Sequence, residues 1–185
     1  MLSESARMSS SVEARFRVQE PNSKPRSIKV IALDAPSEDV VRRLAEASWN
    51  RATFFTASSF AGAPQGEQGL STRREPQGRP EPSRETKDGW LRDLVGRPCD
   101  LMHEVHTADL VVMIATAGCS ARAASIIGEA CSLKRVMTTA LVVGGTSASD
   151  EALSRTLAPL RPWSLMVVIA DSDDYIEDML IALRA

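Results

Sequence analysis

The sequence has few aromatic residues, few cysteines and no long apolar run. Aromatic side chains make up 4% of the 185 residues, so Val, Leu, Ile, Met and Ala must build the core. The three cysteines are an odd number without zinc-like spacing, which favours reduced thiols. No apolar run approaches the roughly 20 residues of a membrane span, and residues 1–27 hold no apolar core of a secretory signal. We therefore expect a cytoplasmic protein that is not embedded in a membrane.

A surplus of positive charge is also missing. The formal net charge of -2 argues against a nucleic-acid partner, because such binders usually carry a basic surplus. A chain of 185 residues is long enough for one domain with a sizeable core. We interpret residues 1–27 as a flexible N-terminal arm and residues 28–185 as a single domain. Within it, the polar stretch 61–88 repeats Gly and Pro and lacks aromatic residues, which predicts a long disordered loop.

The remaining sequence alternates apolar strands with helices. Strands are predicted at 28–33, 52–57, 110–115, 136–143 and 163–170, and helices behind Ser37, across 90–108 in two pieces, at 120–133, behind Ser149 and at 175–183. Strands that are almost continuously Val, Ile, Leu and Met are typical of a parallel sheet covered on both faces. We predict an α/β fold: a Rossmann-like, doubly wound, three-layer sandwich around a mainly parallel five-stranded sheet.

The candidate site is the turn between strand 110–115 and the helix that follows. In an open parallel sheet, ligands bind where strands end and helices begin. A phosphate could bind the backbone amides of Gly118 to Ala121, helped by the hydroxyls of Thr116 and Ser120 and by the helix dipole, with Arg122 as the nearest cation. In the alternative interpretation, Thr116 and Ser120 only cap the helix and Gly118 makes the turn.

Other loops are expected at the same edge of the sheet. The candidate ligand-binding residues are Thr116, Gly118, Cys119, Ser120, Ala121, Arg122, Gly144, Gly145, Thr146 and Asp171. The turn after the first strand, Asp34-Ala-Pro36, lacks the glycines that let a pyrophosphate approach, and its acid would repel one. We therefore predict that Asp34 is a structural cap.

The sequence assigns no catalytic residue and no metal site. Cys119 lies at a predicted helix start, where a thiol can become a nucleophile, but only His103 and His106 on the preceding helix could serve as its base. A packed thiol is the more common alternative. The acids of the 171–174 segment could ligate a metal, although acids at a helix start are also what the dipole favours.

The order of motifs resembles the GTPase domain of the FtsZ/tubulin family. Ile28-Lys-Val-Ile31 is similar to its opening strand, and the segments 108–118, 123–130, 139–143 and 164–169 are similar to successive strands and helices around its phosphate and base sites. The resemblance implies a nucleotide-domain scaffold. The family's Gly-Gly-Gly-Thr-Gly-Thr-Gly loop is replaced here by 118–124, Gly-Cys-Ser-Ala-Arg-Ala-Ala, and its second domain and acidic catalytic loop have no counterpart. A polymerising GTPase is therefore not expected.

Two functions follow from these patterns. The first is a non-catalytic scaffold or regulatory protein that binds another protein or a second copy of itself, as a homodimer. The second is a protein, enzymatic or not, that binds a nucleotide or another small phosphorylated ligand at the carboxyl edge of the sheet. No cofactor is established by the sequence, and a nucleotide is left open.

Overall fold

The computed structural model of this protein describes residues 25–57, 90–171, 173–183 and 185. The predicted arm, up to residue 24, and the predicted loop 61–88 lie outside the described residues. Ser27, at the end of the predicted arm, is bound to the sheet: its backbone N–H donates to the Asp109 carboxylate at 2.8 Å, and its carbonyl accepts from the Asp109 N–H at 2.8 Å.

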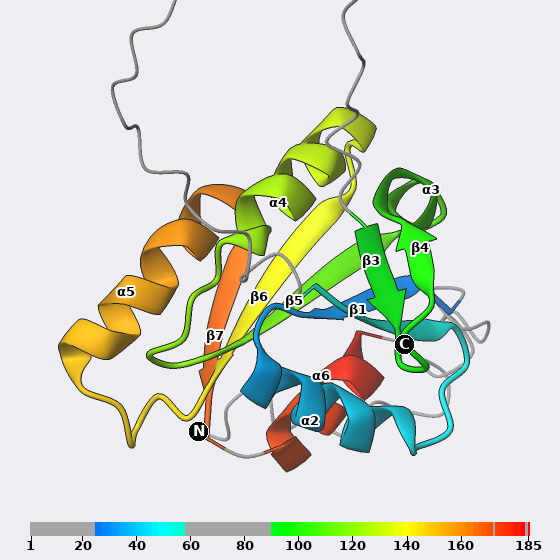
Figure 1. The fold of residues 1–185 in the computed structure, drawn as a ribbon. Helices are drawn as coiled ribbons and strands as arrows, with labels where there is room; N and C mark the ends of the chain where they lie inside the picture. Colours follow the sequence, from blue (N-terminus) through cyan, green and yellow to red (C-terminus); the bar gives the residue numbers. More distant parts are fainter. Residues whose placement is uncertain (1–24, 58–89, 172, 184) are drawn as a thin grey trace, which may run out of the picture.

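One mixed sheet forms the middle of the molecule (Figure 1). Its strands are β1 (Ile28–Ala32), β2 (Ala52–Thr56), β3 (Trp90–Asp93), β4 (Pro98–Asp100), β5 (Leu110–Thr116), β6 (Met137–Val143) and β7 (Met166–Ala170). They lie in the order β4-β3-β2-β1-β5-β6-β7. Neighbouring strands are parallel throughout the part β2-β1-β5-β6-β7. The α/β class and the mainly parallel sheet are thus confirmed. The sheet has seven strands, two more than the five predicted.

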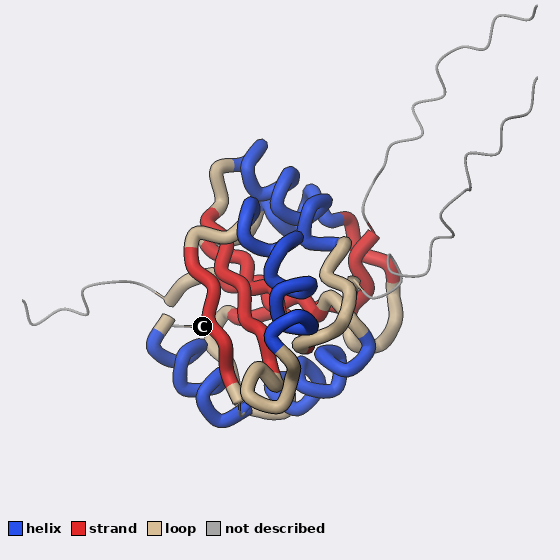
Figure 2. Tube along the Cα trace, turned by 90° about the vertical axis from the view of Figure 1, so that its left-hand side faces the viewer, coloured by secondary structure: helices blue, strands red, loops and turns tan. Residues whose placement is uncertain are grey.

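Helices cover both faces of this sheet, as Figure 2 shows. They are α2 (Ala35–Ala45), α3 (Leu101–His106), α4 (Ala123–Lys134), α5 (Asp150–Leu160) and α6 (Asp173–Ala182), with a 3-10 turn at Arg161–Trp163. The helices α3, α4 and α5 share one apolar cluster with the first face, and α2 and α6 share another with the second. The strands carry aliphatic side chains on both faces because both are buried.

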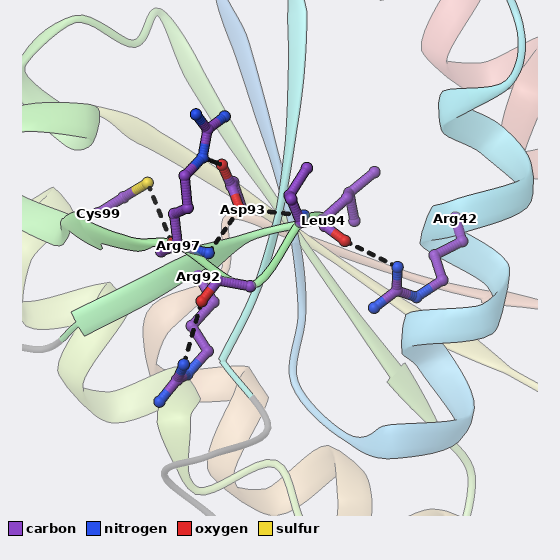
Figure 3. Close-up of polar contacts among 8 residues, drawn as sticks. Arg42, Arg92, Asp93, Leu94, Arg97 and Cys99 are labelled. Carbon is purple, nitrogen blue, oxygen red and sulfur yellow. Dashed lines mark hydrogen bonds and ion pairs between the residues drawn. The ribbon is translucent and has the colours of Figure 1, made fainter.

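The two additional strands correct the prediction of a helix beginning near residue 90. The segment forms an antiparallel β3–β4 hairpin, which also pairs with β2 (Figure 3). Its turn is closed by Asp93, whose carboxylate accepts the N–H groups of Val95 and Arg97 at 3.0 and 2.8 Å. Both bonds hold the pKa of Asp93 below its ordinary value, and the bond from the Arg97 N–H has the largest effect. The helical spacing of Leu91 and Val95 was misleading, because Leu91 is buried in the core whereas Val95 is 80% exposed.

Three predicted boundaries also change. Helix α2 begins at Ala35, two residues before the predicted Ser37 cap, because Asp34 is its N-cap and Ser37 completes the capping box from within the helix. Helix α4 begins at Ala123 rather than near Ser120, and its N-cap Arg122 makes no side-chain capping bond. Strand β7 begins at Met166 rather than at residue 163, because the 3-10 turn extends α5. The predicted Ser149 cap of α5 is confirmed, since its hydroxyl accepts the Ala152 N–H.

Candidate functional site

The predicted site lies at the carboxyl ends of the parallel strands. From β1, the strand order extends in one direction through β2. In the other direction it extends through β5, β6 and β7. This change of direction falls between β1 and β5, and in open α/β sheets such a point leaves the crevice in which ligands bind. Here Asp34 follows β1, and Thr116 ends β5.

The Asp34 side chain occupies this position. One carboxylate oxygen accepts the Thr116 N–H at 2.8 Å, and the other accepts the Thr116 hydroxyl at 3.0 Å and the Ser37 N–H at 2.9 Å. Asp34 is 6% exposed. The predicted capping role is therefore confirmed, and the same carboxylate also joins the ends of two neighbouring strands. Beside it, the hydroxyl of Thr56 at the end of β2 donates to the carboxylate of Glu38.

The loop between β5 and α4 uses several of its backbone groups internally. The N–H of Ala117 donates to the carbonyl of Val143, and the N–H of Cys119 donates to the carbonyl of Thr116. The Gly118 N–H donates to the buried hydroxyl of Thr156 at 2.9 Å, and that hydroxyl in turn donates to the Cys119 carbonyl at 2.9 Å. Gly118 has a φ of +89°, which explains why glycine makes this turn. Two of the amides considered for phosphate binding are thus bonded within the protein.

Ser120 and Arg122 are exposed on the outer side of this loop. Ala121, between them, is buried. The structure therefore brings the predicted loop residues to one edge of the sheet but gives them different surroundings. The hydroxyl of Thr116 faces Asp34 rather than the start of α4.

A second aspartate holds the loop that follows β6. One oxygen of Asp171, directly after β7, accepts the N–H and the hydroxyl of Thr146 at 3.0 and 2.8 Å. Gly145 packs against this strand so closely that an added Cβ would lie 2.2 Å from Cγ2 of Ile169. The predicted residues Gly144, Gly145, Thr146 and Asp171 therefore do lie together. Gly144 turns the chain there with a φ of +75°.

Cys119 is poorly suited to be a nucleophile. Burial raises the pKa of its thiol, and the negative charge of Asp34 raises it further. Burial alone raises the pKa of Cys131 to about 12. Among the described residues, no group of three or more His, Cys, Asp or Glu side chains could hold a metal ion. No helix in the described ranges is long and apolar enough to cross a membrane.

Sequence reasoning missed Thr156, which ties the β5–α4 loop to α5. It is fully buried yet lies 38 residues from Gly118 along the chain. A lone Thr in an amphipathic helix gives no periodic signal, so only the tertiary fold reveals its role.

No protein-family model matches the chain, and no curated protein matches its sequence.

Proposed function

We propose that the protein is a non-catalytic, Rossmann-like scaffold that works by binding another protein chain, including a second copy of itself. The observation that carries this proposal is the position of Asp34. Its carboxylate lies where the strand order changes direction, the position at which comparable sheets bind their ligands, and it is held there by the N–H and hydroxyl of Thr116. A carboxylate in this place repels an anionic ligand and already uses the hydrogen bonds that such a ligand would need.

The thiol next to the crevice supports the same proposal. The pKa of Cys119 is raised, so the group is kept in its unreactive protonated form at neutral pH. Asp34 contributes to that shift, which means that the residue at this position also makes the Cys119 thiol a weaker nucleophile.

A second candidate function is the binding of a small phosphorylated ligand further out on the same edge. It is favoured by the start of α4 at Ala123, beside which Ser120 and Arg122 are exposed. A helix start of this kind attracts anions through its dipole. The resemblance to FtsZ/tubulin domains belongs with this candidate and remains a prediction.

A thermal-shift experiment separates the two functions. The full chain is heated with a panel of nucleotides, nucleotide cofactors and inorganic phosphate. The scaffold predicts no saturable rise in Tm. A saturable rise that Ser120→Arg abolishes would support the ligand-binding function instead. Ser154→Arg, at an exposed position on α5, is the matched control for the added charge.

A further inference from the structure

Strand β7 is an edge strand without a charged residue. Among the described strands it pairs with β6 alone, and its sequence, Met166–Ala170, is entirely apolar. An edge strand presents unpaired N–H and C=O groups, and natural sheets usually protect them with Lys, Pro or a bulge. In the part of the chain that the structure describes, β7 has no such protection by sequence. Its edge is suited to pair with another strand.

Exposed apolar side chains surround this edge. Leu165 is 79% exposed, Ile169 is 47% exposed, and Met166 and Met137 are each more than two-fifths exposed. Met137 and Leu165 lie together in the wall of one pocket, so they form part of a continuous surface. Single exposed aliphatic residues are ordinary, but a group of them along an open strand marks an interaction surface.

The charges around β7 are arranged with opposite signs at its two ends. Arg135 and Arg161 lie near its start, and both are exposed. Asp171 follows its end directly and is also exposed. In an antiparallel pair of two β7 strands, the start of each strand lies beside the end of the other. The basic end of one copy would then meet the acidic end of the second, so the edge is complementary to itself in charge.

A pocket at the start of β7 supports this arrangement. It has a volume of about 320 Å³, and its walls include Arg135, Trp163 and Ser164. The Ser164 hydroxyl is buried without a hydrogen-bond partner among the described residues. A buried polar group usually has a partner, so this one suggests a group supplied from outside the chain. If two strands pair with Val168 at the centre, Leu165 lies opposite Asp171, so Asp171 of one copy lies beside the pocket of the other.

We propose that two copies of this chain form a homodimer by antiparallel pairing of their β7 strands, centred on Val168. Asp171 after each strand would lie at the pocket containing Arg135 and Ser164 of the other copy. This inference specifies the self-association in the function proposed above. The two can fail separately, because a monomeric chain would overturn this dimer and leave Asp34 in its crevice.

The mass of the full chain in solution tests the dimer. Sedimentation equilibrium should give the mass of two chains. The double variant Leu165→Glu/Met166→Glu places acids opposite the acidic end and should give the mass of one chain, with an unchanged circular dichroism spectrum. Val95→Glu, at a similarly exposed position on the β3–β4 hairpin, should remain dimeric. A wild-type chain that is monomeric at every concentration would overturn the proposal.

Cross-linking tests the register and does not depend on folding of the double variant. Val168→Cys should form an intermolecular disulfide under mild oxidation, because opposite residues in an antiparallel pair lie about 4.5–5.5 Å apart at Cβ. Mass spectrometry should find the peptide containing residue 168 joined to itself. Val95→Cys should not cross-link. A dimer that lacks the 168–168 cross-link and survives Leu165→Glu/Met166→Glu would show that another surface associates.

The charges provide a third measurement. Arg135→Gln should raise the dimer Kd by about tenfold, a loss of about 1.4 kcal/mol, and should reduce its dependence on salt. Arg92→Gln, at an exposed position on β3 in the hairpin at the far side of the sheet, is the matched control. An equal Kd for wild type and Arg135→Gln would rule out the proposed contact with Asp171.

Discussion

Asp34 and Thr116 are 82 residues apart in the sequence, and the carboxylate of the first accepts both the backbone N–H and the hydroxyl of the second. The bond joins the ends of β1 and β5 where the strand order changes direction. Asp171 and Thr146 repeat the arrangement at the ends of β7 and β6. In both places an aspartate after one strand holds a threonine beside the neighbouring strand. At the carboxyl edge of this sheet, both aspartate carboxylates are thus used in hydrogen bonds within the chain.

Replacing Asp34 should lower the stability of the fold. Asp34→Ala removes the N-cap of α2 and leaves the Thr116 N–H without its partner. We expect the free energy of unfolding in urea to fall by about 2–4 kcal/mol. Asp34→Asn, which keeps one acceptor oxygen, should lose less. Asp39→Ala, at an exposed position in the same helix, should change it by less than about 0.5 kcal/mol. Equal losses of unfolding free energy in Asp34→Ala and Asp39→Ala would contradict a stabilising role for the hydrogen bonds of Asp34.

Gly128 should not tolerate even a methyl group. A Cβ at this position would lie 2.4 Å from Cβ of Trp163 and 2.5 Å from Cγ at the base of its ring. Because Cβ of Trp163 is attached directly to the backbone of the 3-10 turn and cannot easily move, Gly128→Ala should reduce the free energy of unfolding by about 1–3 kcal/mol. Glu129→Ala, an exposed neighbour on α4, is the control. The close packing would be disproved by a Gly128→Ala variant that matches wild type in urea.

The cysteines should react slowly in the folded protein. A thiol is alkylated as the thiolate, so a raised pKa lowers the rate at a given pH. The pKa of Cys131 is raised to about 12 by burial, and we expect no labelling by iodoacetamide at pH 8 until the protein is unfolded. The rate at Cys119 should be below that of an unstructured peptide and should rise with pH.

The same labelling tests the effect of Asp34 on Cys119. Asp34→Asn removes a negative charge that raises the pKa of the thiol, so labelling of Cys119 at pH 8 should become faster. Asp39→Asn is the control for loss of an acid elsewhere on the helix. An unchanged rate in Asp34→Asn would show that the carboxylate does not act on the thiol.

Two ion pairs should differ greatly in their contribution to stability. Nζ of Lys29 lies 2.8 Å from Oε2 of Glu104, and the two side chains are 9% and 20% exposed. The Lys29 ammonium also lies over the Phe55 ring. Glu104→Gln leaves the Lys29 charge largely buried, so we expect a loss of about 2 kcal/mol or more in unfolding free energy. Arg97→Ala breaks an equally short pair with Asp93 that is exposed to solvent, and should have no measurable effect. Similar losses for both variants would contradict this difference in burial.

Much of the fold could be predicted because burial on both faces leaves a clear pattern in the strands. The run from Leu110 to Ala115 is apolar throughout, and its strand is buried at every one of these positions. The hairpin at Trp90–Asp100 could not be predicted by periodicity. Leu91 and Val95 have helical spacing, yet the structure is set by the local bonds of Asp93 and by pairing with the distant β2.

The candidate residues could be placed together at one edge of the sheet, but their contacts could not be predicted. The rule that parallel strands end at one edge brings Thr116, Thr146 and Asp171 together without any knowledge of contacts. The bond between Asp34 and Thr116 depends on the register of β1 against β5, and the bond from Gly118 to Thr156 depends on how α5 packs. Neither is encoded in local spacing, so the sequence could suggest a phosphate site without revealing what occupies the crevice.

A crystal structure grown from a phosphate- or sulfate-containing solution, inspected at Asp34 and at residues 118–121, tests directly whether this edge excludes anions. We expect Asp34 to keep both bonds to Thr116 and no anion to lie on the backbone amides of this loop. An anion bound to those amides, with Asp34 turned away from Thr116, would contradict the proposed scaffold function and identify the edge as a ligand-binding site.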